Sequence, residues 1–131
     1  MTMREIVFRG KHKATGKWCE GNLHVDKQGV AIITPDDTPL GCYGQVDPDT
    51  VGQYTGLIDK NGKKIFEGDI VVLTLPAAKM HWRAVYKFHS GAFGMVWEHM
   101  GERWQAFAGI CNAEYEVIGN IHDNPELVEG E

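Results

Sequence analysis

Histidine and aspartate are the side chains of this chain that could hold a metal. His81, His89 and His99 fall in adjoining segments, but their spacings match no zinc pattern. Isolated histidines at the surface or at strand edges are the preferred interpretation. Clustered carboxylates could hold a hard cation, yet they follow no calcium-loop spacing: Asp36, Asp37, Asp47 and Asp49. We therefore predict neither a metal nor a cofactor.

A nucleophile, a base and an orienting acid could be drawn from Cys19, His24 and Asp26. Nucleophilic catalysis requires these groups to touch. Side chains alternate along an extended strand, so Cys19 points to the face opposite the other two. No glycine-rich segment continues into Gly-Lys-Ser/Thr, which argues against a phosphate loop. We predict that the protein is not an enzyme.

Charge offers a different chemistry, because it is unevenly distributed. The net charge is -5, yet residues 1–17 carry five basic side chains against one acidic, a balance of +4 that leaves -9 on the rest. The basic N-terminal edge could contact phosphate through Arg4, Arg9, Lys11 and Lys13. A solvated face is the preferred interpretation, because non-specific nucleic-acid binders usually carry a larger basic patch.

Aromatic side chains could form a stacking platform for bases or a groove for a peptide. Trp82 and Trp97 are the candidates for such contacts, within a group that also contains Trp104, Tyr86, Phe88 and Phe93. Filling a hydrophobic core is the preferred role for most of them, because a small domain has few other sources of stability.

Short alternating segments must position these residues. Residues 70–75, 81–88, 93–97 and 115–121 read as strands of one barrel-like sheet, and the first 34 residues read as antiparallel hairpins. Asn61-Gly62 predicts a tight turn with positive φ at the glycine, and Val71 and Val117 are expected in one core. Asn124 before Pro125 predicts one short helical turn. The fold class is all-β, with short antiparallel strands in an SH3-like small barrel plus an N-terminal β segment.

Three blocks of the sequence resemble the YopX family of proteins encoded by phages and prophages. The blocks are residues 46–71, residues 3–10 with Trp18 and Gly21, and residues 115–127. With 131 residues, the chain is expected to form a single YopX-like domain, in which residues 1–50 are an N-terminal hairpin and loop region and residues 51–131 a barrel region. Residues 79–112 do not follow the family pattern, so any individual specificity is expected there.

The resemblance and the lack of catalytic patterns together predict a non-catalytic phage or prophage accessory protein that binds an unknown host or phage protein. Self-association into a homo-oligomer is left open. A nucleic-acid-associated module is the alternative, and the net acidity counts against it. Three cysteines without a Cys-x-x-Cys pair indicate reduced thiols, and no apolar segment suggests a signal peptide or membrane span. We expect the protein in the cytoplasm of a bacterial host cell.

Overall fold

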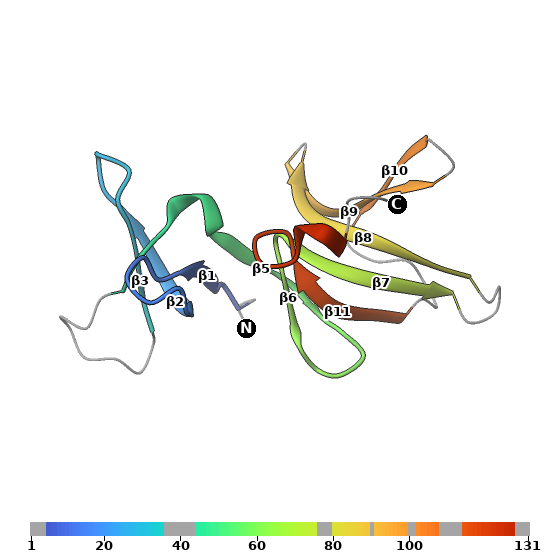
Figure 1. The fold of residues 1–131 in the computed structure, drawn as a ribbon, viewed down its shortest axis with the longest axis horizontal. Helices are drawn as coiled ribbons and strands as arrows, with labels where there is room; N and C mark the ends of the chain where they lie inside the picture. Colours follow the sequence, from blue (N-terminus) through green and yellow to red (C-terminus); the bar gives the residue numbers. More distant parts are fainter. Residues whose placement is uncertain are drawn as a thin grey trace, which may run out of the picture. The chain divides into compact units, whose positions relative to one another are not determined.

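A computed structural model describes residues 5–35, 44–75, 80–89, 91–99, 102–107 and 114–127, without the side chains of residues 80, 81, 89, 97–99 and 102–107. The chain divides into two compact units, Met1–Tyr54 and Thr55–Glu131, called unit 1 and unit 2 below. Figure 1 shows their strands.

The strands of unit 1 form successive antiparallel hairpins. They are β1 (Phe8–Lys11), β2 (Trp18–Val25), β3 (Ala31–Thr34) and β4 (Gly44–Val46), followed by a 3₁₀ turn, η1 (Pro48–Thr50), and by β5 (Gly52–Ile58), which runs into unit 2. The order in this sheet is β4-β3-β2-β1-β5-β6, where β6 is Lys64–Phe66 of unit 2. An isolated bridge between His12 and Val46 also links the end of β1 to β4.

Unit 2 contains the longer strands. They are β6 (Lys64–Phe66), β7 (Asp69–Leu75), β8 (Met80–His89), β9 (Ala92–His99), β10 (Glu102–Phe107) and β11 (Glu114–Asn120), with a final 3₁₀ turn, η3 (Pro125–Leu127). The five-stranded sheet has the order β10-β9-β8-β7-β11, and its pairs are antiparallel. The four segments expected in one sheet are therefore in one sheet, and the turn at Pro125 is also confirmed.

The all-β prediction is confirmed, whereas the closed barrel is not found. In the described part of the chain, helical structure is confined to three-residue 3₁₀ turns. Neither sheet order returns to its first strand, so the described strands form two open sheets. Closing a sheet requires its two edge strands to pair along their length. In the six-stranded sheet the edge strands are β4 and β6, and the bridge between His12 and Val46 joins β4 to the end of the inner strand β1 instead.

The core of unit 1 is built from residues of β1, β2, β3 and β4. Ala31, Ile33 and Val46 are buried there, and Phe8 and Leu23 pack against them. In this core β1 approaches β4 closely at Gly10. A Cβ atom on Gly10 would lie 2.9 Å from Cγ2 of Val46. Gly21 is constrained more tightly, because its Cβ would lie 2.2 Å from the backbone oxygen of Thr34, which explains a glycine in the N-terminal family block.

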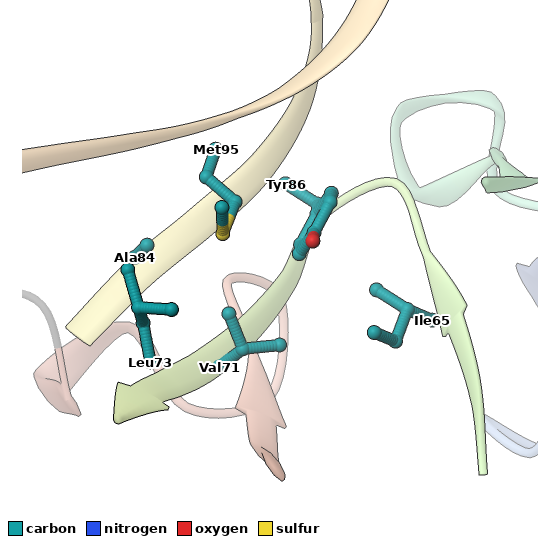
Figure 2. Close-up of a cluster of buried hydrophobic side chains, with 6 residues drawn as sticks. All are labelled: Ile65, Val71, Leu73, Ala84, Tyr86 and Met95. Atoms are coloured by element: carbon teal, nitrogen blue, oxygen red, sulfur yellow. The ribbon is translucent and has the colours of Figure 1, made fainter. Parts of the chain in front are cut away.

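The core of unit 2 lies between the main sheet and the hairpin of β5 and β6. Figure 2 shows its buried members: Ile65 from β6, Val71 and Leu73 from β7, Ala84 and Tyr86 from β8, and Met95 from β9. Val71 and Val117 are direct partners in the pairing of β7 with β11, and Val117 packs against the cluster. The prediction that these two valines share one core is confirmed.

Two turns share the sequence pattern Asp-Lys-x-Gly. One joins β2 to β3 in unit 1, and the other joins β5 to β6 in unit 2. In each, Oδ1 of the aspartate, Asp26 or Asp59, accepts N–H bonds of 2.9 Å from the residues two and four positions later. The glycine, Gly29 or Gly62, donates its N–H to the aspartate carbonyl at 3.0 Å. Both glycines have positive φ, 86° and 81°. The turn predicted at Asn61-Gly62 is confirmed, with three loop residues between the flanking pair.

We expect Gly62→Val to lower the free energy of unfolding by about 1 kcal/mol or more, because a β-branched residue is strained at positive φ. No atom lies within 4 Å of the position of the added Cβ, so the effect comes from the backbone and not from a clash. Urea titration measures it. Gly62→Asn is the control. Asparagine tolerates this conformation, so this variant should lose less free energy of unfolding than the valine variant. Equal stability of the valine variant and the wild type would contradict the assigned turn.

Candidate functional site

One face of β8 carries a row of apolar side chains that begins in the core and ends in solvent. Ala84 and Tyr86 on this row are buried, and Phe88, two positions further on, lies on the same face. The side chain of Phe88 is 55% exposed. Its strand partner Phe93 contacts it edge-on, with ring centroids 5.2 Å apart and an interplanar angle of 72°. The outer end of the β8–β9 hairpin therefore presents an aromatic pair, Phe88 and Phe93.

The two tryptophans proposed from the sequence occupy different positions. Trp82 is half-buried and packs against the unit 2 core, opposite Leu73 on β7. The side chain of Trp97 lies outside the described part. The sequence grouped Phe88 with the core aromatics and did not select it as a binding residue. Alternation alone could not select it, because Tyr86 and Phe88 share a face and only the end of the sheet exposes one of them.

Two cations of the basic N-terminal edge lie close to a tryptophan. The guanidinium carbon of Arg9 lies 4.7 Å from the centroid of the Trp18 ring, and the ammonium of Lys11 lies 5.8 Å from it. Both are cation–π distances. Arg9 is only 8% exposed, so its charge contacts the protein itself, whereas Lys13 is exposed in the following turn. Arg4 lies outside the described residues.

The pairing of β1 with β2 produces this arrangement. Lys11 is the direct strand partner of Trp18, and Arg9 is that of Glu20. Arg9, Lys11 and Trp18 consequently share the face opposite to Phe8 and Gly10, which face the core. The sequence contained the signal in the alternation of the two strands, but their register was needed to bring Trp18 beside the two cations.

The catalytic group considered from the sequence is separated in the structure. Cys19 packs against the unit 1 core, and His24 on the same strand is exposed. Asp26 accepts backbone bonds in its turn, and Asp47 caps η1 by accepting the N–H of Asp49 at 3.0 Å. Within the residues whose side chains are described, no three His, Cys, Asp or Glu side chains are grouped to hold a metal ion. Asp36 and Asp37 and the side chains of His81, His89 and His99 lie outside that part.

Two buried titratable groups of unit 2 have shifted pKa values. Burial raises the pKa of the Tyr86 phenol, and Tyr115 adds to the shift, so Tyr86 stays neutral at ordinary pH. Burial alone would raise the pKa of Asp59, but bonds from the amides of Val117, Lys63 and Asn61 and the charge of Lys63 outweigh it. The pKa of Asp59 therefore lies below its ordinary value. Both groups belong to the framework of unit 2.

The fold and surface described above define a small all-β protein of short antiparallel strands. This chain belongs to the YopX protein family, whose model matches residues 7–129. The match covers the sequence blocks described above from residue 7 onward, so the resemblance inferred from the sequence is confirmed. No curated protein matched the sequence.

Two solved structures resemble this one. Protein yopX from Bacillus subtilis is 19% identical, with a TM-score of 0.61. Protein EF1440 from Enterococcus faecalis is 26% identical, with a TM-score of 0.51. Each alignment covers 97% of this chain and 100% of the other. Across the described residues, the structure contains no helix with the length and apolar character needed to span a bilayer.

Proposed function

We propose that this protein is a non-catalytic accessory protein of a phage or prophage, and that it acts in the bacterial cytoplasm by binding a host or phage protein. The exposed aromatic pair at the end of the β8–β9 hairpin carries the proposal. The pair falls in residues 79–112, the segment in which the sequence predicted individual specificity. The five-stranded sheet is proposed as the SH3-like element that presents it.

Physical chemistry supports a binding role for Phe88. An exposed phenylalanine contributes little to the stability of its own fold, whereas burial against a partner removes a large apolar area from water. Phe93 holds the ring edge-on from the neighbouring strand, so less side-chain freedom is lost on binding. Aromatic residues are enriched in protein–protein interfaces, and a few of them dominate the binding energy.

The test compares tagged full-length wild type with Phe88→Ser, after chemical cross-linking in bacterial host cells and quantitative mass spectrometry. Val25→Ser is the matched control, because Val25 is 53% exposed on β2 of unit 1. We expect a specific partner with wild type and Val25→Ser, and at least about a tenfold loss of its recovery with Phe88→Ser. Equal recovery with all three proteins would show that Phe88 is not part of the binding surface.

The alternative function is association with nucleic acid through the surface around Trp18, where two cations lie close to an aromatic ring. Arg9 is mostly buried in that contact, which leaves few accessible charges for phosphate. We expect labelled DNA and RNA, titrated at two salt concentrations, to bind no tighter than about 10⁻⁴ to 10⁻⁶ M. Submicromolar binding at physiological salt that is lost in a Lys11→Ala, Lys13→Ala double variant would favour this alternative over protein binding.

A further inference from the structure

Strand β11 lies at one end of the five-stranded sheet, whose order is β10-β9-β8-β7-β11, so it pairs with β7 on one side only within this sheet. In an antiparallel strand, alternate residues direct their backbone N–H and C=O groups to the neighbour and to the open side. An open side of this kind invites pairing with another chain, and proteins usually block it. The backbone groups of β11 that point away from β7 therefore need partners of another kind.

The turn at residues 59–63 supplies these partners. The N–H of Val117 donates to Oδ2 of Asp59 at 3.0 Å, and the carbonyl of Tyr115 accepts from the N–H of Lys60 at 2.8 Å. Tyr115 and Val117 are two positions apart, as expected for groups on the same side of a strand. The ammonium of Lys60 also lies 3.8 Å from Oε1 of Glu116. One carboxylate oxygen and one turn amide thus stand where the carbonyl and amide of an added strand would be.

The matched turn in unit 1 shows that this contact is not required by the turn itself. Asp26 uses Oδ1 for the same two local bonds as Asp59, to Gln28 and Val30. Its turn closes with the same glycine conformation. The bond from Val117 to the second oxygen of Asp59 joins residues 58 positions apart, and it belongs to the edge of β11.

We infer that Asp59 and Lys60 block the open edge of β11, and that they thereby prevent β11 of a second copy of this chain from pairing there. The alternation of β11 favours that partner. Tyr115 and Val117 pack against the core, while Glu114 on the alternate face is exposed. A strand added beside β11 must alternate in the same phase to extend this apolar face, and another copy of β11 does so.

The experiment uses full-length protein and two pairs of matched variants. Asp59→Asn keeps one carbonyl oxygen for the turn but directs an amide toward the N–H of Val117, and Asp26→Asn makes the same change in the turn that has no edge to guard. Lys60→Pro removes the N–H that bonds Tyr115 at a turn position that favours proline. Lys27→Pro is its counterpart. Amide hydrogen exchange and light scattering over a range of concentrations are the measurements.

We expect the backbone N–H of Val117 in the wild type to be protected from exchange, although this N–H points away from β7. Asp59→Asn should speed exchange at Val117 at least tenfold and raise the molar mass above that of the wild type as concentration increases. Lys60→Pro should raise the mass in the same way, which keeps the test valid if Asp59→Asn fails to fold. The variants at Asp26 and Lys27 should keep the wild-type mass. Unprotected Val117 in the wild type, or a wild-type mass for both unit 2 variants, would overturn the inference.

Discussion

Leu73→Ala is expected to lower the free energy of unfolding by about 2–5 kcal/mol, the range for removing a fully buried leucine. Leu73 has no exposed surface, and it belongs to the cluster that joins β6, β7, β8 and β9 in Figure 2. Truncation removes apolar contacts and leaves a cavity, because the surrounding sheet cannot collapse onto it. A small domain has only about 5–15 kcal/mol of stability, so this single change uses a large part of it.

Urea denaturation followed by circular dichroism measures this loss. Ile58→Ala is the control, because Ile58 is an aliphatic residue of similar size that is 59% exposed. Substitutions at exposed positions away from special features usually change stability by less than about 0.5 kcal/mol. If the two variants lost similar amounts, Leu73 would not be in the core of unit 2.

Asp59→Ala is expected to have the second large effect, a loss of about 2 kcal/mol or more at neutral pH. Asp59 is only 5% exposed, and its carboxylate accepts three backbone N–H bonds, from Asn61, Lys63 and Val117. Leaving a buried donor without an acceptor costs about 1–3 kcal/mol, and water can satisfy part of the need at the exposed turn. Asp26→Ala is the matched control, and its loss should be smaller because its bonds are local and exposed.

The effect of Asp59 should also depend on pH. Its pKa is lower in the folded state than in the unfolded chain, so folding favours the ionised form. The stabilisation is therefore fully present above about pH 4 and is lost as the pH falls through the folded-state pKa. We expect the difference in unfolding free energy between wild type and Asp59→Ala to shrink between pH 7 and about pH 3. A constant difference across that range would show that ionisation of Asp59 does not contribute.

Several features of the fold were determined by the sequence within short windows. Alternation of apolar and polar residues located β8, β9 and β11, because a strand with one buried face has a period of two, and a short β-branched apolar run located β7. The pair Asn61-Gly62 predicted positive φ, and Pro125 predicted the final 3₁₀ turn. These predictions succeeded because each depends on the conformational preferences of a few adjacent residues.

The tertiary structure alone decided which distant groups meet and which side chains remain exposed. Strand register brought Trp18 beside Arg9 and Lys11, and the docking of one turn brought Asp59 to Val117. The exposure of Phe88 followed from the position at which the sheet ends, although Phe88 and buried Tyr86 occupy equivalent positions in the sequence pattern. Whether the sheets close depended on pairing between their edge strands. Local sequence preferences do not fix such long-range contacts, because these contacts depend on how complete strands pair and pack.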